Sequence, residues 1–423
     1  YYNYQILLEC AGPNTDRIRR ALGQALRANP QLMAKFGVDS TGRFTQTFPI
    51  SAIDMDEISI HEVASAQEAR EICWMKAAVP FNLEEGPAIA VDEIRINGYS
   101  TWFVLTMNEI LIDGWGAMKF MEQLISLFKC RNMDDQEIEV KTAMTSVLEY
   151  FQHLSKPKEI SAEARKFWSK SLDGVKSCFP LRDTLNNSCD PYAASVIEVS
   201  LDDEATAEIR STAHALSTSP FAVFVAAYSL ALAAVSDQHD FVVGAPVAGR
   251  NDEYEIGVPT LMLNMIAIRT RIDVEKKISD TVRSMISNVT EAVSFGDSVF
   301  SKVVSEFADH TNEDPLFSTM VNMLTYPSLE FWDGDRSLHL TELNTGFTKY
   351  DASLYIQRHG EDYTLQLAYK VAYVTPERAN KVLALTAWFL TSDWLSGKTT
   401  VANAIKTALN DCDTSQITML KSY

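Results

Sequence analysis

Apolar residues in the first 130 positions follow two spacings, one typical of buried strands and one typical of amphipathic helices. The segment YQILLEC and the aromatic, β-branched run TWFVLTMN, residues 101–108, predict strands. Apolar residues three and four positions apart predict a helix that begins at Asn14 or Thr15 and ends before Pro30. The same spacing predicts a second helix over residues 116–128. Strands and helices therefore alternate along this part of the chain.

A polar, charged stretch from about Arg131 to Glu163, which contains Lys156-Pro157-Lys158, interrupts this pattern. We expect a boundary near residue 176 between an N-terminal lobe (1–176) and a C-terminal lobe (177–423). The predicted strands of the second lobe are SVIEVSL, DFVVGAPV, LMLNMIAIRTRI, MVNMLTY and YTLQLAYK. Its last predicted helix begins after Thr375-Pro376. This order of elements indicates the α/β (α+β) fold class.

One nearly uninterrupted apolar run, PFAVFVAAYSLALAAV (residues 220–235), could be either a membrane span or a core helix. It is shorter than the roughly 20 residues that a bilayer requires. Ser219 followed by Pro220 is typical of a helix N-cap and first helical position. We therefore predict a helix in the core of a lobe and no contact with a membrane.

Composition and charge argue against several classes of partner and site. The formal net charge of −19 argues against a nucleic-acid partner, because phosphate neutralisation needs a basic surface. The six cysteines are scattered without a CxxC pair, so the sequence supports neither a zinc site nor a redox motif. The first residues lack the pattern of a secretory signal, which indicates a cytoplasmic location.

The motifs of common hydrolases and nucleotide-binding enzymes are absent from the sequence. There is no GxSxG, no glycine-rich phosphate loop and no HExxH, and none of the seven histidines has the spacing of a metal ligand. The remaining candidate is NEILIDGWG, residues 108–116, where a predicted strand gives way to a predicted helix. Reactive groups are commonly presented at such a junction.

This segment resembles the HHxxxDG motif of the condensation domains of nonribosomal peptide synthetases, which are relatives of chloramphenicol acetyltransferase. Asn108 and Glu109 stand at the positions of the two histidines, whereas Asp113 and Gly114 match the end of the motif. Further segments resemble those of the family in the same order: KFWSKSLDG, FVVGAPVAGRN, GVPTLMLNMIAIR, SFGDSVFSKVV, DPLFSTMVNM and TKYDASL. The resemblance implies two chloramphenicol acetyltransferase-like lobes, arranged as a V around a central tunnel.

The resemblance also implies roles for residues around the motif. The family's aspartate pairs with an arginine, which corresponds here to Asp113 with Arg250, and we expect a bidentate contact that satisfies both carboxylate oxygens. Gly114 is expected to allow backbone geometry that a side chain would hinder. Trp115 is expected to pack at the tunnel wall. Asn264 either faces the tunnel or is a core asparagine bonded to backbone, and the sequence leaves both alternatives open.

Condensation domains join two substrates, each carried as a thioester on the phosphopantetheine arm of a carrier protein. The resemblance therefore implies carrier proteins and neighbouring synthetase domains as partners, with no resident cofactor and no metal. The second motif histidine handles a proton or positions the attacking amine. Glu109 at that position only accepts hydrogen bonds when ionised and is a poor proton shuttle, and the amide of Asn108 exchanges no proton usefully.

Two main functions remain open from the sequence, besides a hydrolase or small-molecule acyltransferase of the same superfamily. We favour a domain that is impaired in amide-bond formation and serves as a docking or gating platform for carrier proteins or for a tailoring enzyme acting in trans. The alternative is an active but unconventional acyltransferase that forms an amide or an ester between carrier-bound thioesters. In that case Glu109 would be the base or would position the amine, and orientation would supply most of the rate.

Overall fold

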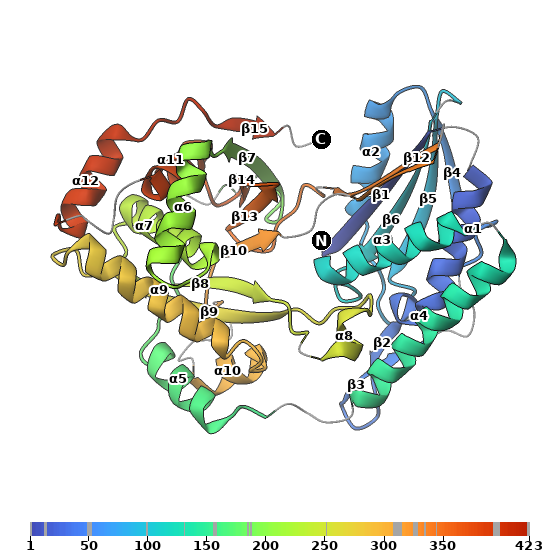
Figure 1. Ribbon diagram of the computed structural model, residues 1–423, viewed down its shortest axis with the longest axis horizontal. Coiled ribbons are helices and arrows are strands. Elements are labelled where there is room, and N and C mark those ends of the chain that lie inside the picture. Colours follow the sequence, from blue (N-terminus) through green and yellow to red (C-terminus); the bar gives the residue numbers. More distant parts are fainter. Residues whose placement is uncertain are drawn as a thin grey trace.

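The chain folds into two lobes, each built around one sheet (Figure 1). The computed structural model describes residues 2–11, 15–48, 53–98, 100–130, 132–154, 159–183, 186, 188–250, 252–307, 315–324, 329–333, 336–343, 345–391 and 398–420. The predicted interruption at Lys156-Pro157-Lys158 lies outside the described residues.

The sheet of the first lobe has six strands in the order β11-β12-β1-β6-β5-β4. The strands are β1 (Asn3–Ala11), β4 (Ser59–Val63), β5 (Ile89–Ile96), β6 (Ser100–Asn108), β11 (Leu329–Asp333) and β12 (Arg336–Leu343). A separate hairpin is formed by β2 (Lys35–Val38) and β3 (Phe44–Thr47), after the short 3₁₀ helix η1 (Pro30–Met33).

Helices cover both faces of this sheet because successive side chains of a strand point to opposite sides. Ile6 and Leu8 pack with helices on one face, while Leu7 packs on the other. The first face holds α1 (Thr15–Ala28), α3 (Gly114–Lys129) and α4 (Met133–His153), and the second holds α2 (Ala66–Ala77). The predicted strands at YQILLEC and TWFVLTMN and the two predicted helices are all present.

The second lobe contains a seven-stranded sheet in the order β15-β7-β14-β13-β10-β8-β9. Its strands are β7 (Ala194–Ser200), β8 (Asp240–Val247), β9 (Asn264–Arg271), β10 (Thr319–Leu324), β13 (Ala352–His359), β14 (Asp362–Lys370) and β15 (Thr418–Leu420). Its helices are α5 (Ala162–Leu172), α6 (Asp203–Ala215), α7 (Pro220–Ser236), α8 (Glu253–Ile256), α9 (Ile278–Ser294), α10 (Phe300–Phe307), α11 (Pro376–Thr391) and α12 (Val401–Asp411).

The apolar run at residues 220–235 forms the central core helix α7 of this lobe. Its residues from Ala222 to Ala233 are all buried, and it packs against α6, α9 and α11. Burial on all sides explains the lack of a polar stripe in its sequence. Among the described helices, none alone has the length and apolar composition of a membrane span, and α6 with α7 pass that test only as a pair bent by 109°.

Two helices depart from the sequence analysis, one that it did not predict and one that it predicted wrongly to be the last. The polar stretch after Arg131 contains the 21-residue helix α4, which buries only four side chains and therefore shows little apolar periodicity: Gln136, Val140, Val147 and Tyr150. The helix that begins at Pro376 is not the last, because α12 follows it. Helix α12 packs against α7, α9 and α11.

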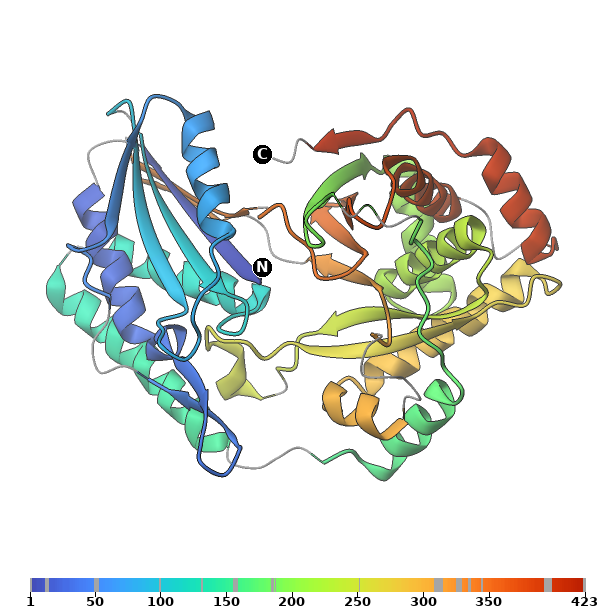
Figure 2. The same ribbon diagram turned by 180° about the vertical axis from the view of Figure 1, so that it is seen from behind.

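The chain crosses from the second lobe back to the first. Strands β11 and β12 come from residues 329–343, and β12 pairs antiparallel with β1 from Gln5 to Ala11. Figure 2 shows this crossing from behind, with β12 joining the sheet of the N-terminal half. The lobe around β1 is thus completed by residues far along the chain. Helix α5 packs in the core of the second lobe although it precedes the predicted division between 1–176 and 177–423.

Candidate functional site

The motif residues 108–113 form the turn between β6 and α3. The Asn108 backbone N–H donates to the Ala88 carbonyl at 2.8 Å, and the Leu111 N–H donates to the Asn108 carbonyl at 3.0 Å. The Asn108 side-chain Oδ1 accepts from the Ile110 N–H at 3.1 Å. This amide therefore stabilises its own turn, as asparagine commonly does. The arrangement gives Asn108 a local structural task.

Glu109 connects the two lobes. Its carboxylate forms an ion pair with Lys349, which lies between β12 and β13, and both side chains are about half-exposed. The Glu109 N–H donates to the Tyr2 carbonyl at 2.7 Å. The Lys349 ammonium also lies 4.8 Å from the centre of the Tyr2 ring. Glu109, at the second motif position, is thus already paired with a lysine of the second lobe.

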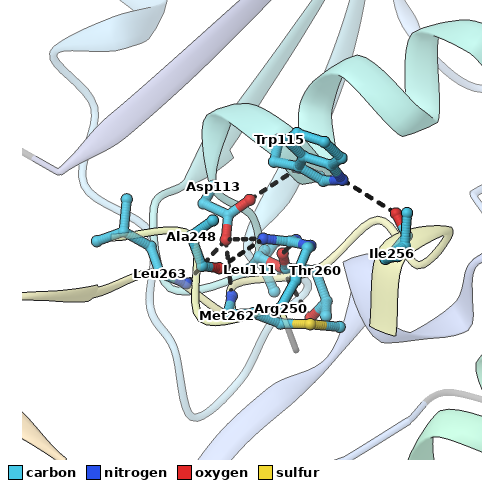
Figure 3. A network of polar contacts seen from close by, with 10 residues as sticks. Leu111, Asp113, Trp115, Ala248, Arg250, Ile256, Thr260, Met262 and Leu263 are labelled. Atoms are coloured by element: carbon cyan, nitrogen blue, oxygen red, sulfur yellow. Dashed lines mark hydrogen bonds and ion pairs between the residues drawn. The ribbon is translucent and has the colours of Figure 1, made fainter. Parts of the chain in front are cut away.

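Asp113 is the best-connected residue of the motif (Figure 3). Its Oδ1 caps α3 by accepting from the Gly116 N–H at 2.7 Å. Its Oδ2 accepts from Arg250 Nη1 at 2.8 Å and from the backbone N–H groups of Met262 and Leu263 at 2.8 and 2.9 Å. The expected contact of Asp113 with Arg250 is present, and it joins the lobes.

The expected bidentate geometry is wrong. Only Nη1 of Arg250 reaches Asp113, while Nη2 donates to the Thr260 carbonyl at 2.8 Å. The second carboxylate oxygen is not available, because it serves as the cap of α3. The guanidinium therefore bridges the carboxylate and the Thr260 carbonyl, while the carboxylate itself binds the backbone of Met262 and Leu263.

Close backbone approach explains the glycines near this contact. A Cβ at Gly116 would lie 2.7 Å from the Thr260 carbonyl oxygen, and one at Gly249 would lie 1.9 Å from the Met262 carbonyl oxygen. Gly249 also has a φ of 62°, a conformation that favours glycine. Gly114, the expected conformational glycine, opens α3, and the close approach to the other lobe falls at Gly116.

Trp115 and Asn264 both have protein partners. The Trp115 indole N–H donates to the Ile256 carbonyl at 3.0 Å, so this ring packs where α3 meets α8. Asn264 Nδ2 donates to the carbonyls of Gly296 and Ser298, and its Oδ1 accepts from the Phe300 N–H. The Asn264 amide thus holds the 296–300 loop, which agrees with the alternative of a core asparagine bonded to backbone.

Several ionisable groups that the motif comparison did not identify lie near Glu109. Burial, together with the charge of Glu109, raises the pKa of Tyr350 to about 12. Burial raises the pKa of Tyr355 as well, and the charges of Glu342 and Glu109 add to this effect. Glu342 has an exposed side chain and accepts a hydrogen bond from the Tyr4 hydroxyl at 3.0 Å. Glu342 and Glu109 belong to the first lobe, whereas the tyrosines belong to the second.

A polar row crosses the sheet of the second lobe on the face opposite α7 and α11. The cross-strand register aligns Asn322, Tyr355, Gln366 and Glu198 on four adjacent strands. Gln366 donates to Glu198 at 3.0 Å, and all four side chains are half-buried. Besides burial, the charges of Glu342 and Glu109 in the first lobe raise the pKa of Tyr355, so this polar face lies toward that lobe.

A pocket of about 510 Å³ lies at the carboxyl ends of β8 and β10. Its wall combines hydroxyl, amide and apolar side chains: Thr218, Ser219, Val247, Val289, Asn322 and Met323. The volume falls within the range of small-molecule sites. Asn322 belongs to this wall and to the polar row, so the two features adjoin.

Comparison with known proteins gives the family. The Condensation domain family matches residues 1–383. The chain belongs to the condensation domain family. A curated relative, one of the plipastatin synthase subunits of Bacillus subtilis (strain 168), is 22% identical over 380 residues, which cover 89% of this chain and 14% of that relative. This condensation domain therefore spans a small part of the length of that relative.

Solved structures share the fold of this condensation domain. A four-domain nonribosomal peptide synthetase in its holo form, bound to AMP and glycine, aligns with a TM-score of 0.78 at 13% identity, over 95% of this chain and 32% of that one. The condensation domain of the monacolin K polyketide synthase aligns with a TM-score of 0.72 at 15% identity, over 95% and 94% of the two chains. Both likenesses agree with the expected chloramphenicol acetyltransferase-like fold class.

Proposed function

We propose that this condensation domain belongs to a nonribosomal peptide synthetase and receives substrates on the phosphopantetheine arms of carrier proteins. Its curated relative is part of such a synthetase, and one structural neighbour is a four-domain synthetase. The proposed partners are the carrier proteins, the adjoining synthetase domains and a tailoring enzyme acting in trans. The reactants would meet between the lobes, where the motif turn, Lys349 and the polar row of the second sheet come together.

We further propose that the motif residues do not promote ordinary amide-bond formation, so the domain acts as a docking or gating platform. The observation that carries this proposal is the ion pair of Glu109 with Lys349. A proton-transferring group must reach the reacting nitrogen at hydrogen-bond distance. Glu109 is instead bound to an ammonium of the other lobe, and the Asn108 amide is bound to its own turn.

The test is a reaction between two substrate-loaded carrier proteins, followed by intact-mass measurement of the acceptor carrier. We expect no condensed product above the uncatalysed level and measurable binding of at least one loaded carrier. The matched variants are Glu109→Gln, which removes the charge, and Glu62→Gln, which changes an exposed carboxylate on the edge strand β4.

Product that forms with the native chain and with Glu62→Gln, but disappears with Glu109→Gln, would overturn the proposal. That result would establish the alternative, in which Glu109 is the base or positions the amine of an active acyltransferase. A double variant with histidine at positions 108 and 109 tests the surrounding site. Product from that variant alone would show that only the proton-transferring groups are missing.

A further inference from the structure

The pocket at the carboxyl ends of β8 and β10 lies where these two parallel strands separate. They are joined by a single residue pair, Met320 with Gly244, although β8 continues to Val247 and β10 to Leu324. Beyond this pair β10 stays paired with β13 on its other side. Pro246 has no backbone N–H, so it contributes no donor to a ladder between β8 and β10. The pocket lies in the resulting gap and is lined by residues of both strands.

The pocket is lined from both faces of the sheet. Asn322 belongs to the polar row on the face toward the first lobe. Val289 and Val293 belong to α9, which lies on the opposite, helix-covered face. Val293 is 43% exposed, and Ser219 before α7 is exposed as well. The pocket therefore extends from the lobe boundary through the gap in the sheet to the solvent between α7 and α9.

Aromatic rings connect the motif turn with the pocket. Tyr350 is the residue after the lysine that pairs with Glu109, and its ring centre lies 5.4 Å from that of Phe317. The Phe317 ring lies directly on Gly244, because a Cβ there would be 2.2 Å from a ring atom. Pro246, two residues farther along β8, already belongs to the pocket wall. An apolar surface thus leads from the neighbourhood of Glu109 to the gap between the strands.

The lining of the pocket indicates an uncharged and mainly apolar ligand. Of the twelve described residues that line it, none carries a charge and seven are apolar. The hydroxyls of Thr218 and Thr290 bond to each other at 3.3 Å, so they need no polar group from a ligand. A charged group in this pocket would lose hydration without gaining an ion-pair partner. A hydrocarbon chain has no such cost and is stabilised by its removal from water.

We infer that this pocket holds the apolar chain of the acyl or aminoacyl group that a carrier protein delivers. The reacting end of that group stays at the motif turn, while its chain passes Phe317 and enters the gap beyond Gly244. Asn322 borders the entrance, and Met323 and Val293 limit the space from β10 and from α9. The inference rests on the proposed binding of carrier-tethered substrates.

The test compares S-octyl-pantetheine with S-methyl-pantetheine, two thioethers that share the arm and differ only in the length of the chain. Isothermal titration calorimetry measures their binding to the native chain. We expect the octyl probe to bind about fiftyfold more tightly, because each fully buried methylene strengthens binding about fourfold and the pocket should bury about three of them.

Two variants fill the pocket from different sides, Met323→Trp from β10 and Val293→Trp from α9. Each should reduce the advantage of the octyl probe to about fivefold or less and leave the affinity for the methyl probe unchanged. The matched control is Ser294→Trp, which places the same side chain on the neighbouring exposed residue of α9, outside the pocket lining, and should keep the full preference. Because Val293 lies at the surface, its variant tests the pocket even if Met323→Trp fails to fold.

The outcomes separate the inference from the proposed function. A preference for the octyl probe that survives in Val293→Trp and in folded Met323→Trp would place the chain elsewhere and overturn the inference. Equal binding of the two probes by the native chain would overturn it too, and in both cases binding of the pantetheine arm stands. Equal weakening of both probes by the pocket variants would mean that the pocket holds the arm itself, which also overturns the inference. If neither probe binds the native chain, the proposed binding of carrier-tethered substrates fails, and the inference fails with it.

Discussion

Two ion pairs formed by the turn of residues 108–113 join the lobes. They differ in the exposure of their side chains and in the number of further hydrogen bonds. The side chains of Asp113 and Arg250 are 3% and 2% exposed, and Asp113 accepts three further hydrogen bonds from backbone. The side chains of Glu109 and Lys349 are 40% and 41% exposed. The first pair is part of the interior, whereas the second lies at a solvated boundary.

Within this one motif, Asp113 therefore has a structural role, whereas residues 108 and 109 lie where they can be changed without disturbing the interior. A buried carboxylate that loses its arginine leaves an uncompensated charge, so the end of the motif tolerates little change. An exposed pair contributes little to stability, so residues 108 and 109 can differ without loss of the fold. The fold can therefore match the family whichever side chains stand at positions 108 and 109.

The largest effect is expected for Asp113→Ala. This change removes a helix cap and leaves Arg250 buried without its carboxylate, which should cost about 3–5 kcal/mol in the free energy of unfolding. The control is Asp202→Ala, because Asp202 also caps a helix, α6, but is exposed. The control should lose about 1 kcal/mol. Denaturant unfolding measures both, and equal losses would contradict a special role for the buried pair.

A smaller effect is expected for Gly249→Ala, which tests the backbone around the same pair. Gly249 has a positive φ, and a Cβ there would overlap the carbonyl of Met262, whose N–H binds Asp113. The loop would have to shift, and we expect a loss of about 3 kcal/mol. Gly360 has nearly the same φ but open space around it, so Gly360→Ala should cost only about 1 kcal/mol.

The two glycine variants could unfold at the same denaturant concentration, with the same dependence of the unfolding free energy on denaturant. The close approach at Gly249 would then contribute nothing to stability. In that case the contact of residues 248–263 with the motif turn would be looser than the hydrogen bonds indicate. The comparison isolates the overlap, because the strain from the positive φ is common to both positions.

The sequence predicted those strands and helices whose apolar periodicity is visible among neighbouring residues. Strands β1 and β6 and helices α1 and α3 have clear apolar periodicity, and α7 is apolar enough to be assigned to the core. Helix α4 was missed because a helix on the surface of a lobe buries few residues, and charge dominates its sequence. Its start could have been inferred from Asn132, which caps it, followed by acidic residues in the first turn.

Only those contacts of the site that involve residues of the family motifs could be predicted from the sequence. The contact of Asp113 with Arg250 followed from the resemblance, but the way their hydrogen bonds are shared did not. Lys349 follows β11 and β12, through which the chain crosses back to the first lobe, and it pairs there with Glu109. Such pairing between distant segments has no signature in local spacing, so Lys349 could not be connected to Glu109 beforehand.

The smallest effect is expected for the exposed pair itself. In a double-mutant cycle with Glu109→Gln and Lys349→Met, the coupling free energy should be about 0.5 kcal/mol and should decrease as salt is added. The half-exposed position of both side chains is the reason, because water and ions screen their attraction. A coupling of about 3 kcal/mol that resists salt would mean that this pair locks the lobes as firmly as Asp113 and Arg250 do. The reaction centre would then be closed by a structural contact, and the lack of product that we propose would follow from this closure rather than from the chemistry of Asn108 and Glu109.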